Sequence, residues 1–346
     1  MLSVLVTGVG GPVGVSIVKA LRMSALKPRI VGTDADPLSV GLFRTDAAYV
    51  LPHVTADEAG YVARLQEICL TERVAMVCFG SEIEMRRLAP HLSDMEQITG
   101  TRLILNRPQF IDAFMDKWEM VCLLRGKGLP APDSALATDP AAVNMFLDRH
   151  AFPLILKPRH GSGSQGVTIV RSRVELDFLS RHVSEPVIQE YLLPDDEEYT
   201  VGVYKSPRTG YVGQIVLKRQ LSAGWTYKAE VIRDEQIESV CRRVVETFDV
   251  WGPINLQVRK TAAGVQVFEI NLRFSGSAVI RAYFGFNEPE MCLRDAIHGE
   301  SRSQPEVTLG DALRYWDEIY LQPDDYPTDP AQPRPLGPHG TKVDNF

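Results

Sequence analysis

The sequence predicts a mixed fold, α/β in its amino-terminal part and α+β thereafter, and three observations predict it. The chain opens with a strand, a glycine-rich turn, an amphipathic helix and a second strand, which is the pattern of a parallel sheet. A second glycine-rich loop, at residues 161–166, lies between two strand-like runs instead of before a helix. Two further runs within residues 254–271 alternate in polarity and are joined by a short turn, as in an antiparallel hairpin.

Composition limits the class of protein. The 346 residues are long for one core and indicate two or three domains. A net charge of -7 argues against general nucleic-acid binding, because no basic surplus exists to displace counterions from a phosphate backbone. No apolar run approaches the ~18 residues of a membrane-spanning helix, and the start of the chain lacks signal-peptide features, so a cytoplasmic protein is expected. The scattered cysteines include no Cys-x-x-Cys pair, which predicts neither disulfides nor a thiolate zinc site.

The opening turn, residues 7–14, matches Thr-Gly-x-x-Gly-x-x-Gly, and Asp34 follows its last glycine by about twenty residues. That context is expected of a dinucleotide-binding fingerprint, so NAD is one interpretation. The other is a tight turn whose glycines let strand and helix backbones approach closely, with no cofactor. No tyrosine in the chain has a lysine four residues on, so the Tyr-x-x-x-Lys pair of short-chain dehydrogenases is missing.

The rest of the first domain adds a helix near residues 59–71, a strand at 74–79 and a strand at 103–105. The tripeptide Gly80-Ser81-Glu82 directly follows the second of these elements, where a loop of a parallel sheet should carry a ligand group. The same three residues also suit a helix N-cap with an acid in the first turn, which is the commoner meaning.

The second glycine site follows a predicted helix at 110–127, which carries Lys117, and a second helix at 141–149. Strand leads to loop and back to strand at residues 152–170, which excludes a Walker loop, because that loop opens a helix with Gly-Lys-Ser/Thr. The pattern suits a flexible hairpin whose backbone N–H groups close over phosphates, with Lys157 supplying charge from the strand. In isolation, the loop would be interpreted as a mobile surface hairpin with an exposed lysine.

A strand ending in Gln-Glu-aromatic near Glu190 is followed by the acidic run 195–198. Backbone groups there can meet a purine edge, and Glu198 can accept hydrogen bonds from ribose hydroxyls. A run of acids is otherwise usually solvent-facing. Lys218 and Arg219, which end the strand at 211–217, either face the same anion or are scattered surface charges.

The hairpin at 254–271 carries the remaining chemistry. Alternation places Glu269 and Asn271 on one face, roughly 7 Å apart, with Asn255 or Gln257 across from them. Such oxygen ligands suit a hard cation shared with phosphate oxygens, and Arg273 extends the row with a positive charge. The alternative is an edge strand whose ordinary polar residues face water.

The order and spacing of these motifs resemble the ATP-grasp superfamily, above all the halves of the carbamoyl-phosphate synthetase large subunit and stand-alone carboxylate–amine ligases. The resemblance covers about residues 1–300. It implies a Rossmann-like pre-ATP-grasp domain at 1–110, a small subdomain with the phosphate lid at 111–188, and a large subdomain with the magnesium site at 189–300. Residues 301–346 would add a final strand, at 314–320, and a proline-rich tail.

The resemblance also implies residue roles. Catalytic roles would fall to Arg273, Lys218 and Lys157. The nucleotide would be bound by Lys117, Lys157, Gly161, Ser162, Gly163, Ser164, Gly166, Glu190, Tyr191, Leu192, Glu198, Lys218 and Arg273. Magnesium, with manganese as an alternative, would be held by Gln257, Glu269 and Asn271. The family's Asn-Pro-Arg is Asn-Leu-Arg here, and the first ligand, often acidic, is a glutamine, which leaves the choice between Asn255 and Gln257 open.

The implied activity is an ATP- and magnesium-dependent carboxylate–amine, or carboxylate–thiol, ligase that acts through an acyl phosphate and releases ADP and phosphate. Small-molecule acids and amines would be the partners, with no nucleic acid or membrane, and a homodimer is possible. Ser275, Gly276, Ser277 and Arg281 follow the metal strand and are positioned to meet an acceptor or its carboxylate, although a helix N-cap explains the serines nearly as well. Two other interpretations stay open: an NAD(P)-dependent oxidoreductase using the opening turn, and a non-catalytic nucleotide-binding protein.

Overall fold

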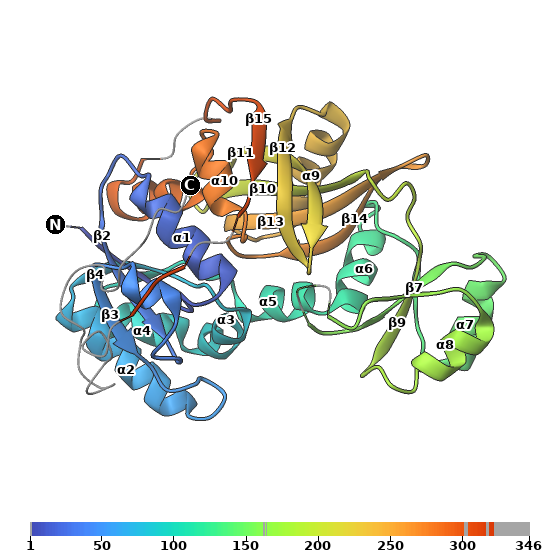
Figure 1. Cartoon of the computed structure of the whole chain (residues 1–346), viewed down its shortest axis with the longest axis horizontal. Helices are drawn as coiled ribbons and strands as arrows, with labels where there is room; N and C mark the ends of the chain where they lie inside the picture. The colour runs from blue at the N-terminus through green and yellow to red at the C-terminus, as the bar shows by residue number, and fades with distance from the viewer. Residues whose placement is uncertain (1, 162, 164, 301–303, 316–317, 322–346) are drawn as a thin grey trace.

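The computed structural model describes the whole chain except residues 1, 162, 164, 301–303, 316–317 and 322–346 (Figure 1). It contains three sheets, which occupy successive parts of the chain. The predicted proline-rich tail from residue 322 lies outside the described residues.

The first sheet is parallel and has five strands in the order β3-β2-β1-β4-β5. Its strands are β1 (Ser3–Val6), β2 (Arg29–Asp34), β3 (Ala47–Val50), β4 (Val74–Cys78) and β5 (Arg102–Leu103). Its helices are α1 (Pro12–Arg22), η1 (Val40–Phe43), α2 (Glu58–Thr71), α3 (Glu82–Leu88), η2 (Ala89–His91) and α4 (Leu92–Thr99). The strand order reverses between β1 and β4, so the loops at 7–11 and 79–81 meet at the carboxyl edge of the sheet, where such sheets bind ligands.

The second sheet is antiparallel and small, with four strands in the order β6-β9-β7-β8. Its strands are β6 (Ser134–Leu136), β7 (Leu154–Pro158), β8 (Thr168–Val170) and β9 (Pro186–Glu190). The helices α7 (Pro140–Leu147) and α8 (Arg173–Leu179) cover it, and Figure 1 shows this unit as a separate lobe. Its core is a small cluster that includes Phe146, Leu154 and Ile188. The lobe presents the loop at 161–166 between β7 and β8.

The predicted helix at 110–127 is in fact two helices, α5 (Pro108–Met115) and α6 (Lys117–Gly126). Asp116 breaks the run because its backbone is extended and its side chain accepts hydrogen bonds from Trp118 N and Glu119 N. These contacts cap α6 and satisfy donors that a continuous helix would have bonded internally. Lys117 is thereby the first residue of a helix.

The third sheet is antiparallel and large, with six strands in the order β14-β13-β10-β11-β12-β15. Its strands are β10 (Glu198–Ser206), β11 (Gly210–Ser222), β12 (Trp225–Ile232), β13 (Gly252–Thr261), β14 (Gly264–Asn271) and β15 (Gly310–Leu313). Its helices are α9 (Glu235–Thr247), α10 (Ala278–Tyr283), α11 (Glu288–Leu293) and the π-helical turn η3 (Arg294–His298). The final strand therefore lies before the predicted span 314–320, in which residues 316–317 are outside the described set.

One face of the large sheet packs against α9. Ile237, Cys241, Val244 and Val245 recur at helical spacing and are buried. They belong to the same apolar cluster as the alternating Ile254, Leu256 and Val258 of β13. The residues between those three apolar side chains must point to the opposite face.

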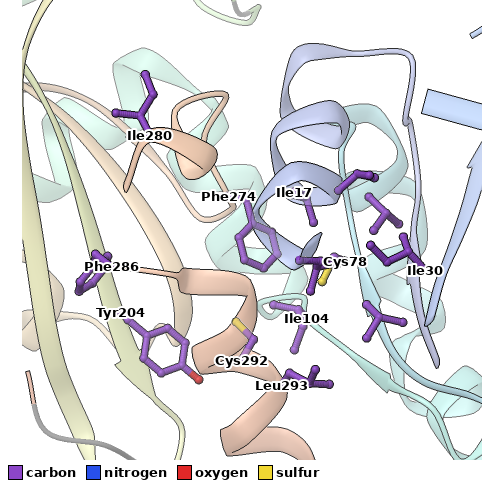
Figure 2. Close-up of a cluster of buried hydrophobic side chains, with 14 of the residues drawn as sticks. Ile17, Ile30, Cys78, Ile104, Tyr204, Phe274, Ile280, Phe286, Cys292 and Leu293 are labelled. Carbon is purple, nitrogen blue, oxygen red and sulfur yellow. The ribbon is translucent and has the colours of Figure 1, made fainter. Parts of the chain in front are cut away.

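An apolar cluster joins the parallel sheet to the large sheet (Figure 2). Ile17 of α1 and Cys78 of β4 lie opposite Phe274 and Cys292. All four side chains are at most 1% exposed, and burying an isoleucine or phenylalanine side chain such as Ile17 or Phe274 contributes about 1.5–3 kcal/mol. This contact holds the opening glycine turn beside the loop that follows β14. Among the described helices, none combines the length and apolar character required to cross a membrane.

Candidate active site

A cavity of about 670 Å³ lies where the three sheets meet. Its walls come from the carboxyl edge of the parallel sheet, from the 161–166 loop and from one face of β13 and β14. Segments far apart in the sequence thus enclose one space. We take this cavity as the candidate site and place each predicted residue relative to it.

The β13–β14 hairpin provides the polar wall. In its register Gln257 pairs with Glu269, and Asn255 pairs with Asn271, so all four side chains project from one face. All four line the cavity. Asn271 Nδ2 donates to Glu269 Oε1 at 2.8 Å, which leaves the Asn271 carbonyl oxygen directed elsewhere. The wall therefore presents several oxygen atoms, two of them from one carboxylate.

Asn255 and Gln257 differ in what holds them. Asn255 Oδ1 accepts from Thr200 Oγ1 at 2.7 Å and from Arg281 Nη2, so its amide nitrogen is the group left for the cavity. Gln257 Oε1 accepts from Arg219 Nη2 at 2.7 Å and retains a second lone pair. Of the two, the glutamine is the better candidate for an oxygen ligand.

Arg281 does not reach the cavity, so the expected contact with an acceptor is wrong. Its side chain is completely buried, with Nη1 2.9 Å from Glu288 Oε1. Room for the guanidinium exists because residue 202 is glycine: a Cβ there would come within 2.5 Å of Nη1. Arg281 instead supports Thr200 and Asn255 from within the protein.

Two lysines bring positive charge near the polar wall. Lys117 Nζ donates to the carbonyl oxygen of Gly161 and lines the cavity. Lys157 is 5% exposed and donates to Gln189 Oε1 at 2.9 Å. Burial lowers the pKa of Lys157 to about 8, the Lys117 charge acts in the same direction, and Glu269 opposes both. Burial likewise lowers the pKa of Lys117, and Glu269 again opposes the change.

We expect nucleotide affinity to fall as pH rises above about 8. Phosphates bind the protonated form of Lys157, and because its pKa in the folded protein is lowered to about 8, the free protein loses that proton above this pH. The dissociation constant of Mg-ATP should rise up to about tenfold per pH unit, measured by calorimetry between pH 7 and 9.5. A Lys157→Arg variant, which stays charged, should show a flat profile. Equal pH profiles for the two proteins would contradict this role.

The glycine loop reaches the opposite wall of the cavity. Gly161 and Gly163 line the cavity, whereas Ser162 and Ser164 lie outside the described residues and Gly166 does not line it. The loop touches the β11–β12 turn: a Cβ on Gly224 would lie 2.5 Å from the Gly163 carbonyl oxygen. Gly161 and Gly163 therefore lie at the cavity next to Lys117.

The structure does not bring Lys218 to the cavity. Its Nζ donates to Glu197 Oε1 at 2.6 Å, and this contact raises the pKa of Lys218. Neighbouring residues of a strand point to opposite faces, and it is Arg219 that lines the cavity. Sequence reasoning chose the wrong member of this pair, because two adjacent cations give no sign of which face meets a ligand.

The predicted nucleotide-reading residues also lie outside the cavity lining. Glu198 accepts from Arg219 Nε at 3.0 Å and from Arg259 Nη2. The Glu190 carboxylate accepts from Asp133 N at 2.7 Å, beside a separate shallow depression. Tyr191 and Leu192 form hydrogen bonds of their own. The Tyr191 hydroxyl donates to Asp195 Oδ1 at 2.7 Å. The Leu192 carbonyl oxygen accepts from Arg259 Nη1 at 2.9 Å.

Arg273 lines the cavity and is held by an acid from the parallel sheet. Its Nε lies 2.8 Å from Glu82 Oε1, and its Nη1 donates to the carbonyl oxygen of Phe274. Ser81 is the N-cap of α3, and its Oγ accepts a hydrogen bond from Glu84 N at 3.5 Å. For Ser81, the helix-cap interpretation of residues 80–82 is therefore the one that the structure shows. The contact between Glu82 and Arg273 spans 191 positions and was not anticipated from the sequence.

The opening glycine turn is closely packed. A Cβ on Gly14 would lie 2.2 Å from the Gly8 carbonyl oxygen, so only glycine fits there. Asp34 Oδ2 accepts from Gly10 N at 2.7 Å, and its Oδ1 accepts from Asp36 N at 3.1 Å. Both carboxylate oxygens of Asp34 are thus used within the turn. Nearby, burial raises the pKa of Glu84 to about 7.

Two antiparallel sheets that enclose a cavity beside a parallel sheet make up an arrangement that this chain shares with solved ATP-dependent enzymes. The family model described as "ATP-grasp in the biosynthetic pathway with Ter operon" matches residues 182–318. The fold is similar to that of a solved ADP complex of an N5-carboxyaminoimidazole ribonucleotide synthetase, with a TM-score of 0.69 and 17% sequence identity. The match covers 89% of this chain and 80% of the synthetase chain. The predicted fold class is confirmed.

Two curated relatives add a sequence-level match. The chain is 25% identical over 275 residues to the N5-carboxyaminoimidazole ribonucleotide synthase of Synechococcus elongatus, covering 77% of this chain and 67% of the relative. It is 21% identical over 279 residues to the carbamoyl phosphate synthase large chain of Methanosarcina barkeri, covering 75% of this chain. The chain spans only 25% of that second relative's length. These matches confirm the predicted resemblance to the ATP-grasp superfamily and agree with the predicted class of ATP-dependent ligase.

Proposed function

We propose that this chain is an ATP-dependent ligase that joins a carboxylate to an amine through an acyl phosphate. The observation that supports the proposal best is the composition of one cavity. Its lining includes Gly161 and Gly163 of the glycine loop, Lys117, and the oxygen-bearing side chains of Glu269 and Asn271. A triphosphate needs cations and N–H donors on one side and a metal-binding carboxylate on the other, and this cavity offers both.

We further propose that the three sheets correspond to the domains expected from the resemblance. The expected domains are residues 1–110, 111–188 and 189–300, with 301–346 as an extension, although β9 of the small sheet runs on to Glu190 and β15 at 310–313 joins the large sheet. The proposal is supported by the separate apolar clusters of the small and the large sheet.

The donor set fits a magnesium ion. Gln257, Glu269 and Asn271 place oxygen atoms on one sheet face, and magnesium prefers oxygen ligands. In the part of the chain that the structure describes, no three His, Cys, Asp or Glu side chains are grouped to hold a metal. The single carboxylate therefore needs phosphate oxygens from ATP to complete the shell. When bound there, magnesium would neutralise charge on the phosphates and on the departing ADP.

The protein side chains have distinct roles in the proposed reaction. Lys117, Lys157 and the loop N–H groups bind the phosphates, and Glu82 holds Arg273 beside the transferred phosphoryl group. A substrate carboxylate oxygen attacks the γ-phosphorus, and the bond from that phosphorus to the ADP oxygen breaks. The amine nitrogen then attacks the acyl carbon and loses a proton, and phosphate leaves. The closed loop excludes water, which would otherwise hydrolyse the acyl phosphate.

Two measurements test the proposal. Mg-ATP should raise the melting temperature, and ADP should be released when a matching carboxylate and amine are supplied from a panel. NADH stabilisation without an effect of Mg-ATP would favour the oxidoreductase instead. Asp34, which that alternative would place on a ribose, lines the same cavity and accepts one hydrogen bond on each carboxylate oxygen, from Gly10 N and Asp36 N. Binding of Mg-ATP with no ADP release across a broad panel would favour a non-catalytic nucleotide-binding protein.

A further inference from the structure

Arg314 lies in the cavity wall directly after β15, in a part of the chain to which no role was assigned. Its backbone N–H donates to the Tyr227 carbonyl oxygen at 3.0 Å, and its Nη2 donates to the Gly276 carbonyl oxygen. Gly276 comes three residues after Arg273. The guanidinium is thus fixed next to the loop that leads away from the metal-binding face.

The charge of Arg314 is not neutralised within the described structure. The other arginines that line the cavity each have a carboxylate partner: Arg86 with Asp112, Arg219 with Glu198, and Arg273 with Glu82. Among the lining lysines and arginines, only Lys117 and Arg314 form no ion pair with a described residue. Burial lowers the pKa of Arg314, and no described acid opposes that change. A partly buried cation without a counter-charge is unfavourable unless an anion joins it.

A second source of positive potential lies beside the first. Gly11, Pro12 and Val13 open α1 and line the same cavity. The Gly11 N-cap makes no side-chain hydrogen bond, and the first turn of α1 contains no acid. A Cβ on Gly276 would lie 3.9 Å from Pro12, so this helix start adjoins the loop that Arg314 holds. Gly11 N donates to the Gly8 carbonyl oxygen and Pro12 has no N–H, so of these three residues only Val13 has an N–H left to offer an anion at the helix start.

We propose that Arg314, with the first turn of α1, binds an oxyanion group, a carboxylate or a phosphate monoester, carried by the substrate that is not ATP. The statement that this ligand is a substrate rests on the proposed ligase function. The guanidinium is planar and offers parallel N–H donors, which match two oxygens of one anionic group. Because Lys117 serves the nucleotide, Arg314 is the cation left for the second ligand.

The test uses pairs of probes that differ only in charge. Amino acids are compared with their amides, and ribose 5-phosphate is compared with ribose, by ligand-observed NMR on the full chain. Each titration is run with and without a saturating non-hydrolysable Mg-ATP analogue, so that the nucleotide site is filled in one arm. The proteins are wild type, Arg314→Gln and Arg233→Gln. Arg233 is a matched control, because its Nη2 also donates to a backbone carbonyl, that of Val307, outside the cavity lining.

We expect at least one anionic probe to bind the wild type and Arg233→Gln with similar affinity. Its affinity for Arg314→Gln should be about 10- to 100-fold lower, the usual effect of losing a charge-assisted hydrogen bond, while the neutral partner changes less than twofold. The pair that responds identifies the group as carboxylate or phosphate. An Arg314→Lys variant, which keeps the charge, should show an intermediate loss.

Three results would overturn the proposal: no binding of any anionic probe to the wild type, equal binding of charged and neutral partners, or unchanged affinity in Arg314→Gln. If Arg314→Gln does not fold, the proposal is tested by comparing the affinities of charged and neutral probes for the wild type and for Arg314→Lys. A different result would reject the proposed ligase function. Anion binding that depends on Arg314, without ADP release for any acid and amine, would leave this site in place and reject the ligase.

Discussion

Replacing Glu269 by glutamine should reduce ADP release at least about 100-fold while leaving the fold nearly intact. Glu269 is the only carboxylate among the proposed metal ligands, and it opposes the lowered pKa values of both Lys117 and Lys157. Its removal therefore weakens metal binding and removes a charge that opposes the lowering of both lysine pKa values. The glutamine can still accept the hydrogen bond from Asn271, so the free energy of unfolding should change by less than about 1 kcal/mol.

The matched control is Glu230→Gln, on the same sheet but exposed and outside the cavity lining. Steady-state ADP release and chemical denaturation are measured for both variants and the wild type. The control should behave as the wild type in both assays. Full turnover in Glu269→Gln would remove the metal-binding role from the β13–β14 face.

Replacing Arg281 by methionine should cost about 3–5 kcal/mol of unfolding free energy, the largest stability effect that we expect from one substitution. Both Arg281 and Glu288 are 0% exposed, and the guanidinium also donates to Thr200 Oγ1 at 3.0 Å. The substitution leaves a carboxylate buried without its ion-pair partner and removes one of the two hydrogen bonds that Asn255 Oδ1 accepts. Urea denaturation followed by circular dichroism measures the loss.

The double variant Arg281→Met, Glu288→Leu separates charge from packing. Because it removes both members of the ion pair, it should recover much of the lost stability. It should recover less activity than stability, since Asn255 then keeps only the hydrogen bond from Thr200 Oγ1. If the single variant Arg281→Met were as stable as the wild type, the buried ion pair between Arg281 and Glu288 would not contribute to stability as we expect.

The features that could be predicted from sequence are those that a short stretch determines. Glu269 and Asn271 share a face because side chains of a strand alternate, and a short turn sets their pairing with Gln257 and Asn255. The βαβ opening is likewise local. The break at Asp116 was missed although a signal existed, because Asp-x-x-Glu at 116–119 is a helix-start pattern.

Other parts of the site depend on tertiary contacts that no local pattern reveals. Glu82 meets Arg273 only because the parallel sheet packs beside the large sheet. The burial of Arg281 depends on space above Gly202, and the choice of Arg219 over Lys218 depends on which face of β11 meets the cavity. Arg314 was expected to begin a strand, and its position in the wall follows from the pairing of β15 with β12.

A crystal structure with magnesium and a non-hydrolysable ATP analogue tests the central claim most directly. We expect the phosphates to lie between Lys117 and Lys157 on one side and Glu269 and Asn271 on the other, next to Gly161 and Gly163. A nucleotide bound at the opening glycine turn instead, with Glu269 facing only solvent, would contradict it.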